Sequence, residues 1–185
     1  AAQDGGRDGS PLHMIFIALA LSNDARADAG GTLIGDPTET ALYAVARDHG
    51  FDKKKLEQRY PRLAELPFDS ERKCMTTLHR WEDGVIAFTK GAIDVLLDRS
   101  ITVLTSEGLK PVDTGDLQAA NEAMAAQGLR LLCVAMRKWD RIPDVVSPVI
   151  TEKDLTVIGL VGMMDPPRPE ARESVDLCKA AGIIP

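Results

Sequence analysis

The chain has 185 residues, 44% of them hydrophobic, which suffices for one substantial domain and the start of a second. Its 28 acidic and 22 basic residues give a net charge of −6, so a nucleic-acid backbone would be repelled and no nucleic-acid partner is expected. The three cysteines are odd in number and far apart, which argues against a disulfide framework and a zinc site and indicates a reducing compartment. We expect no metal site in this chain.

No stretch of the sequence is apolar for long enough to span a membrane. The longest apolar run, 14–21, is shorter than the roughly 20 residues that a membrane-spanning helix needs. Residues 1–11 are rich in Gly and Asp without periodicity, and we expect a disordered start or a remnant left by cloning there. A buried helix is predicted over 12–21, and the Asn, Asp and Gly residues of 23–31 predict a loop.

The next predicted helix has clear signals at both ends. Asp36 is a good N-cap, Pro37 suits the first helical position, and Glu39 stands where a capping box places its glutamate. Gly50 ends the helix. Between these ends runs an apolar stripe that we expect to be buried, formed by Ala41, Leu42, Val45, Ala46 and His49.

Further along, the pattern indicates strands with helices between them. A charged helix is predicted over 52–59, with Lys53-Lys54-Lys55 on its solvated face. The turn Glu82-Asp83-Gly84 joins two strands into a hairpin, and Pro169 starts a helix beyond the stiff Pro166-Pro167 pair, a domain junction. The fold class is α+β, an antiparallel sheet flanked by helices. The other predicted elements are strands over 64–68, 74–81, 85–89, 101–104, 130–136 and 155–163 and helices over 92–97 and 116–127.

The segment Phe88-Thr89-Lys90-Gly91-Ala92 is the strongest sign of a ligand site. Alternation places Ile86, Phe88 and Lys90 on one strand face, so an ammonium follows two large apolar groups into half-buried surface and needs an anionic or polar partner. Gly91 has no Cβ, so a ligand can approach the backbone closely beside that ammonium. A lysine that only snorkels past apolar neighbours would explain the charge but leave Gly91 unexplained.

Four motifs follow one another along the chain: GDPTETAL at 35–42, PFDSERKCM at 67–75, TKGA at 89–92 and MDPPR at 164–168. In sequence and order they resemble the cytoplasmic nucleotide-binding segment of P-type cation-transporting ATPases, best of all the group that contains the calcium and sodium pumps. The resemblance runs from about residue 12 to the C-terminus. It implies a nucleotide-binding domain over 12–162, and over 163–185 a hinge and the truncated first segment of an α/β phosphorylation domain.

The resemblance also implies an adenine pocket. Phe68 would form the platform on which adenine stacks, whereas a phenylalanine at a strand end, taken alone, is more often a core residue. The carboxylate of Glu39 would accept from the exocyclic amine of adenine, or would only cap its helix. Lys73 and Met75 share a strand face by alternation, and their counterparts in the family line the same pocket. For Lys73 alone, plain solubility is the simpler interpretation.

Other residues are expected to contact the rest of the nucleotide. Lys90 would donate to polar nucleotide atoms or phosphate, and Gly91 would let the base reach the backbone. Arg130 resembles the family arginine that reaches the phosphates, and Arg168 the hinge arginine that approaches the nucleotide when the domains close. The simpler alternative for Arg130 is a surface arginine at a strand start, and for the segment that contains Arg168 it is a rigid linker. Many calcium pumps have a basic residue two positions after the stacking phenylalanine, where this chain has Ser70, so the phosphate contact should be weaker or supplied differently.

The expected ligand is ATP, with Mg²⁺ in the full-length enzyme, and the expected partners are the phosphorylation and actuator domains of the same full-length chain. The expected location is the cytoplasmic face of a membrane, the plasma membrane if the source is bacterial. The sequence contains no Asp-Lys-Thr-Gly-Thr with its phosphorylated aspartate, so we expect no catalytic residue here and an inactive isolated chain. A free-standing nucleotide-responsive binding or interaction module is the alternative. A soluble ATP-hydrolysing enzyme would need a Gly-rich phosphate loop ending in Lys-Ser/Thr, which is absent.

Overall fold

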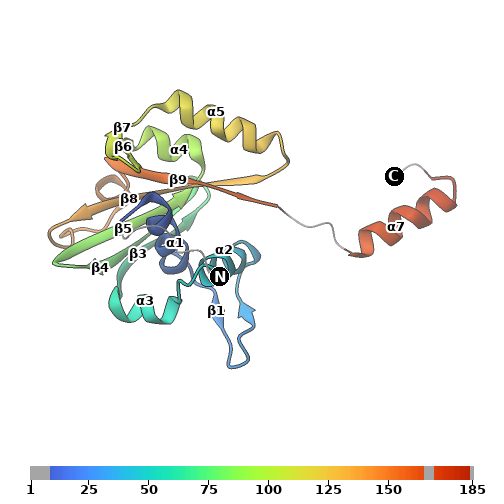
Figure 1. Ribbon diagram of the computed structural model, residues 1–185, viewed down its shortest axis with the longest axis horizontal. Coiled ribbons are helices and arrows are strands. Elements are labelled where there is room, and N and C mark those ends of the chain that lie inside the picture. The colour runs from blue at the N-terminus through green and yellow to red at the C-terminus, as the bar shows by residue number, and fades with distance from the viewer. Residues whose placement is uncertain (1–8, 165–168, 184–185) are drawn as a thin grey trace.

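The computed structural model describes residues 9–164 and 169–183, and its centre is one large sheet with helices on both faces (Figure 1). Seven strands form this sheet in the order β3-β4-β5-β8-β9-β6-β7. All neighbouring strands are antiparallel except β6 and β9, which run parallel. The α+β class predicted from the sequence is confirmed, with one parallel pair added. The strands are β3 (Arg62–Asp69), β4 (Cys74–Trp81), β5 (Gly84–Gly91), β6 (Ser100–Thr105), β7 (Gly108–Pro111), β8 (Arg130–Trp139) and β9 (Leu155–Met163).

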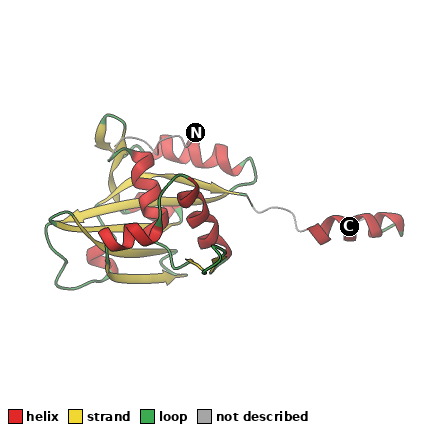
Figure 2. Ribbon diagram, turned by 60° about the horizontal axis from the view of Figure 1, so that its bottom comes forward, coloured by secondary structure: helices red, strands yellow, loops and turns green. Residues whose placement is uncertain are grey.

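Helices cover the two faces of the sheet in separate groups (Figures 1 and 2). On one face the first three helices pack over Ile86, Phe88 and Val134, and on the other the next two pack over Cys133 and Ala135. Because both faces are covered, the central strands are buried along almost their whole length. The helices are α1 (Pro11–Leu21), α2 (Pro37–Asp48), α3 (Lys53–Arg59), α4 (Ile93–Asp98), α5 (Thr114–Ala125), α6 (Pro148–Thr151) and α7 (Pro169–Ala180).

The central hairpin formed by β4 and β5 follows the predicted pattern closely. Trp81 pairs with Gly84 across the turn, and the register continues without a break to Cys74 opposite Gly91. Strict alternation along both strands therefore sends Lys90 to the face on which α1 and α2 pack, as predicted. The lysine is 7% exposed.

Four short elements escaped prediction. β1 (Arg26–Ala27) lies inside the loop predicted over 23–31 and pairs with β2 (Leu33–Ile34), which follows that loop, in a separate two-stranded sheet. β7 and α6 have four residues each. Elements this short contain too few residues for a period of two or 3.6 to appear in the sequence.

The predicted buried stripe of α2 is partly wrong. The helix buries Leu42, Tyr43 and Ala46, whereas Ala41, Val45 and His49 are exposed. The reason is that α2 packs against α1 at the rim of the molecule, so a narrow strip of the helix is covered and the predicted wide face is not. His49 instead lies flat on Phe16, with the ring centres 4.3 Å apart.

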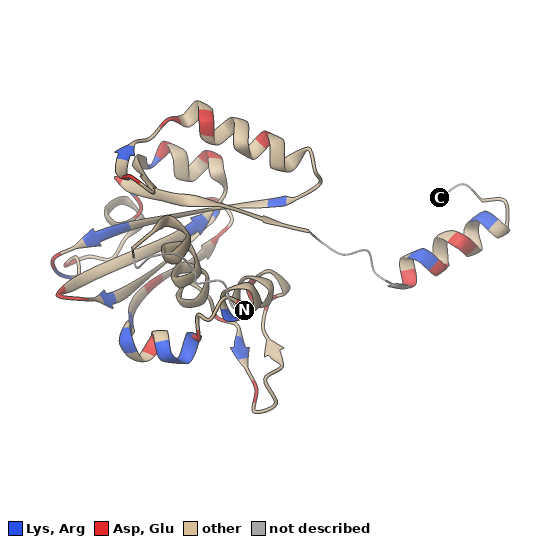
Figure 3. Cartoon of the chain, viewed as in Figure 1, with Lys and Arg blue, Asp and Glu red and all other residues tan. Residues whose placement is uncertain are grey.

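Pro166, Pro167 and Arg168 of the predicted hinge lie outside the described residues. The helix predicted after them is present as α7, which carries both signs of charge, as α3 does (Figure 3). The division into a domain over 12–162 and a segment over 163–185 stays a prediction. Within the described ranges, no helix is both long and apolar enough to cross a bilayer.

Candidate functional site

A pocket of about 450 Å³ opens where the ends of β4, β5 and β8 meet the start of α2. Its walls are mostly apolar, with a few charged groups placed among them, which is the composition typical of a small-molecule site. Six of the eight residues predicted from the sequence line this pocket: Glu39, Phe68, Met75, Lys90, Gly91 and Arg130. The other lining residues are Asp36, Thr38, Leu42, Leu131, Leu132 and Met163.

Phe68 reaches this pocket because β3 contains a bulge. Leu66 pairs with Thr76 and Asp69 pairs with Cys74, so two residues, Pro67 and Phe68, stand opposite the single residue Met75. If β3 paired regularly, without a bulge, Phe68 would lie on the same face as Leu66, which is the side of the sheet away from the pocket.

The bulge turns the Phe68 ring toward the face of Met75 and Lys90. The ring is 65% exposed. Most phenylalanines are buried, and this one lies in solvent at the mouth of a pocket, so the interpretation of Phe68 as a core residue is wrong.

Lys90 and Glu39 form an ion pair inside the pocket. The Lys90 ammonium donates to Glu39 Oε1 at 2.9 Å, and both side chains are largely buried. Burial lowers the pKa of Lys90, and the neighbouring Glu39 carboxylate offsets part of this shift. The polar partner that the sequence demanded for Lys90 is therefore a carboxylate of the same chain.

The capping box predicted at the start of α2 forms only in part. Asp36 Oδ1 accepts from the backbone N–H of Thr38 at 2.8 Å, as an N-cap should. The carboxylate of Glu39 instead accepts from Lys90 and, through Oε2, from the Asp24 N–H at 3.0 Å. A buried ammonium is a stronger partner than the helix's own N–H, and this competition explains the departure.

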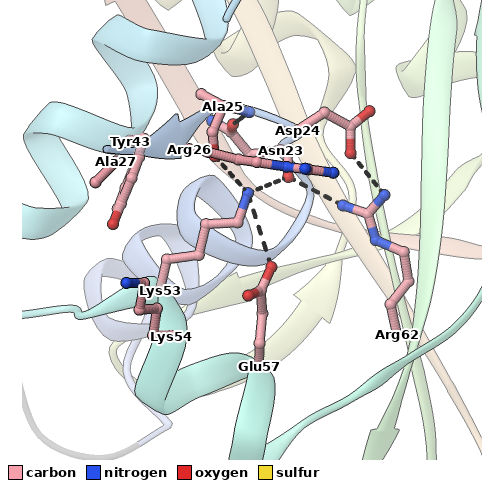
Figure 4. Close-up of a pocket in the computed structure, with 10 residues that line it drawn as sticks. All are labelled: Asn23, Asp24, Ala25, Arg26, Ala27, Tyr43, Lys53, Lys54, Glu57 and Arg62. Carbon is pink, nitrogen blue, oxygen red and sulfur yellow. Dashed lines mark hydrogen bonds and ion pairs between the residues drawn. The ribbon is translucent and has the colours of Figure 1, made fainter. Parts of the chain in front are cut away.

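A second cavity, of about 460 Å³, lies beside the loop that supports Glu39 (Figure 4). Lys53 points from α3 into the segment 23–25, where its ammonium donates to the carbonyls of Asn23 and Ala25 and lies 3.8 Å from Glu57. Arg62 donates to the Asn23 carbonyl and to Asp24 from the other side. The prediction that Lys53 lies on a solvated helix face is wrong, because these carbonyls need a donor and Lys53 supplies it.

Asn23 completes this support. Its side-chain amide donates to the Glu39 carbonyl at 2.7 Å, and its Oδ1 accepts from the Ala25 N–H at 2.7 Å. The side chain is fully buried. The loop around Asn23 therefore fixes both the backbone and the carboxylate of Glu39, a role that no local sequence pattern revealed.

The structure gives a reason for a glycine at position 91 that could not be seen in the sequence. A Cβ at this position would lie 2.5 Å from the Lys73 carbonyl oxygen and 2.5 Å from Cys74 Cβ. The close approach of two backbone segments therefore explains this glycine without any ligand. Gly91 also lines the pocket, so a ligand near its backbone is compatible with this role.

Lys73 does not join the other predicted residues. It precedes β4 in a left-handed conformation with φ of 51°, so the alternation expected to place it beside Met75 does not apply. Its exposed ammonium lies 3.6 Å from Asp94. Arg130 is exposed at the start of β8, on the pocket wall, and Arg168 lies outside the described residues.

A family model for the P-type ATPase cytoplasmic domain N matches residues 13–170. The chain belongs to this family. Similar proteins include "Calcium-transporting ATPase 1" of Bacillus cereus, 39% identical over 173 residues, and "Probable cation-transporting ATPase F" of Mycobacterium tuberculosis, 37% identical over 176 residues. These matches cover 92% and 93% of the chain but only 19% of each relative. The chain thus spans about a fifth of the length of the curated relatives it matches.

Membership in this family confirms the predicted kind of domain, because the chain is the cytoplasmic N domain of a P-type ATPase. The N domain also has a buried carboxylate that the sequence reasoning missed, Glu152, which pairs with Arg72 and Arg99. No group of three or more His, Cys, Asp or Glu side chains that could hold a metal ion occurs in the part of the N domain that the structure describes.

Proposed function

We propose that this N domain binds ATP in the pocket at the ends of β4, β5 and β8, with adenine stacked on Phe68. The observation on which this rests is the exposed Phe68 ring, turned by a bulge toward a pocket that also contains Met75 and the Lys90–Glu39 pair. An aromatic ring in solvent loses hydrophobic stabilisation unless something covers it. A base stacked on it would contribute roughly 1–3 kcal/mol.

The charged groups of the pocket suit different parts of the nucleotide. Glu39 is proposed to accept from the exocyclic amine of adenine, and Lys90, already paired with Glu39, to donate to polar nucleotide atoms. Arg130 stands on the pocket wall at the start of β8, and we assign it to the phosphates. We propose no adenine contact for Lys73, because its ammonium is directed to Asp94 outside the pocket.

In the full-length protein, we propose, the bound ATP is presented to an aspartate of the phosphorylation domain, with Mg²⁺ supplied there, at the cytoplasmic face of a membrane. Residues 163–185 would then be the hinge and the first segment of that domain, and Arg168 would approach the nucleotide on closure. Phosphoryl transfer depends on positioning an in-line nucleophile and a metal. The isolated chain has no Asp-Lys-Thr-Gly-Thr, and we propose that it binds ATP without hydrolysing it.

A nucleotide titration followed by chemical-shift mapping tests the binding proposal. We expect a dissociation constant of roughly 0.1 mM to several mM, since millimolar affinity is only about 4 kcal/mol and one stacked base with a few polar contacts supplies no more. Phe68→Ala should abolish measurable binding, and Arg130→Ala should weaken the binding of ATP more than the binding of AMP. Leu109→Ala removes a side chain that is similarly exposed, at 62%, but lies on β7, so it is the matched control and should bind ATP normally.

Circular dichroism must first show that the Phe68→Ala variant is folded. A folded Phe68→Ala chain that binds ATP as well as the unaltered chain, or GTP that competes as well as ATP, would contradict the adenine platform. Steady phosphate release by the isolated chain, lost in a Lys90→Ala variant, would contradict the proposal that this chain binds ATP without hydrolysing it.

A further inference from the structure

Glu152 is a fully buried carboxylate that lies outside the nucleotide pocket. It follows α6, and its side chain has no exposed surface. Glu152 Oε1 accepts from Arg72 and, at 3.0 Å, from the Thr76 hydroxyl, while Oε2 accepts from Arg99 at 2.7 Å. Burying a carboxylate together with much of two arginine side chains costs desolvation energy, so such a cluster is weak evidence for stability alone and invites a search for another role.

Arg72 connects this cluster to the bulge in β3. One guanidinium nitrogen, Nη1, donates to Glu152, and the other, Nη2, donates to the Pro67 carbonyl at 2.6 Å. The planar fork of arginine makes these two bonds from two separate nitrogens, whereas a lysine would have to make both from a single nitrogen. The Arg72 backbone N–H also donates to Asp69 Oδ1 at 2.8 Å, which closes the turn that follows Phe68.

The bulge needs such a bond because the ladder is interrupted there. Pro67 has no backbone N–H, and Pro67 and Phe68 together stand opposite one residue of β4. β3 is also an edge strand of the sheet, since among the described residues no further strand pairs with its outer side. The backbone that aims the Phe68 ring is therefore held by a side chain, and that side chain is itself held by a fully buried carboxylate.

We propose that Arg72 and Glu152 are positioning residues for Phe68: they fix the Pro67 carbonyl so that the ring is already turned to the pocket before the nucleotide arrives. This inference rests on the proposed function, because it assigns the two residues to the adenine platform of that same pocket. A platform that is ordered in advance loses less entropy on binding, which raises affinity without any new contact to the nucleotide.

The test compares Arg72→Lys, Glu152→Gln and Arg99→Gln in the whole 185-residue chain. Arg72→Lys keeps the positive charge beside Glu152 but removes the second side-chain nitrogen, which donates to the Pro67 carbonyl. Glu152→Gln keeps the shape but loosens Arg72. Arg99→Gln removes an ion pair from the same carboxylate without touching the bulge, so it is the matched control for mere loss of stability. Thermal unfolding of each variant establishes that it is folded.

The first readout is affinity for ATP and AMP. Arg72→Lys and Glu152→Gln should lower the affinities for ATP and AMP by the same factor, roughly three- to tenfold, because part of the stacking on Phe68 is lost. Arg99→Gln should leave both affinities unchanged. If the affinity for ATP falls while that for AMP is unchanged, the inference is overturned in favour of a phosphate contact. If Arg72→Lys leaves the affinity for both nucleotides unchanged, the inference is also overturned.

The second readout needs no nucleotide. Fluorophenylalanine replaces the four phenylalanines, and the ¹⁹F signal of Phe68 is the one missing from a Phe68→Leu chain. This signal should shift or broaden in Arg72→Lys and Glu152→Gln but not in Arg99→Gln. An unaltered chain that binds no ATP overturns the proposed function. An unaltered chain that binds ATP, with a Phe68 signal indifferent to both substitutions, overturns only the positioning role.

Discussion

Lys53 should stabilise the fold far more than its two lysine neighbours do. Lys53→Met keeps a chain of similar length but removes the ammonium that donates to the carbonyls of Asn23 and Ala25. The Asn23 carbonyl keeps a second donor, Arg62, whereas the Ala25 carbonyl loses its charged partner. Leaving a buried carbonyl unpaired costs about 1–3 kcal/mol.

Part of that cost is offset because the ammonium is itself partly desolvated, which is why burial lowers the pKa of Lys53. We therefore expect Lys53→Met to lower the free energy of unfolding by about 2 kcal/mol. With a urea m-value of about 2 kcal/mol/M, the midpoint of denaturation should fall by about 1 M at unchanged m.

The neighbouring lysines provide the control. Lys54→Met and Lys55→Met remove the same unit of charge from the exposed positions of α3 and should change the unfolding free energy by less than about 0.5 kcal/mol. Lys53→Met should also weaken ATP binding, because the Asp24 N–H that orients Glu39 lies in the loosened segment. Equal urea midpoints for the three variants would refute this account of the buried ammonium.

Three further predictions concern His79, Gly91 and the cysteines. Burial lowers the pKa of His79 from 6.5 to about 4, so its contribution to stability is present above pH 6.5 and is lost as the pH falls through 4. The free energy of unfolding measured in urea should therefore fall by about 3 kcal/mol between pH 7 and pH 4. A His79→Gln chain should lack this part of the pH dependence. Gly91→Ala should lower stability by about 1–3 kcal/mol in thermal unfolding with or without ATP, because its Cβ would lie 2.5 Å from Cys74 Cβ; equal stability would show that the two backbones have room to separate. A maleimide should label only Cys178 in the folded chain, since burial raises the pKa of Cys74 to about 11 and that of Cys133 to about 12, and mass spectrometry showing a second rapid label would contradict this.

The sequence predicted best those features that depend on neighbouring residues. The bounds of β4 and β9 agree with prediction, because alternation over eight or nine residues is a strong local signal. Alternation along β5 likewise placed Lys90 on the face of Ile86 and Phe88, which is the face that carries the pocket.

Features that depend on distant residues were not predictable in this way. Simple alternation gives the wrong face for Phe68, since the bulge is visible only in how β3 pairs with β4. Lys53 looked solvated because its partners are backbone carbonyls some 28 and 30 positions earlier in the chain. Glu152 pairs with Arg72 across 80 positions, and a single glutamate in a loop gives no local sign of such a contact.

Two sets of charged residues support the pocket without lining it. Lys53 and Arg62 hold the loop that orients Glu39, and through Glu39 the ammonium of Lys90. Arg72, held by Glu152, fixes the bulge that aims Phe68. Buried charges of this kind stabilise a fold little once their desolvation is counted, but they permit few alternative arrangements. A shallow site with one exposed ring and a few polar contacts has little binding energy to spend on ordering its own walls. Walls already fixed by the scaffold let that energy appear as affinity for the nucleotide, which is why substitutions behind the pocket should weaken binding in a chain that remains folded.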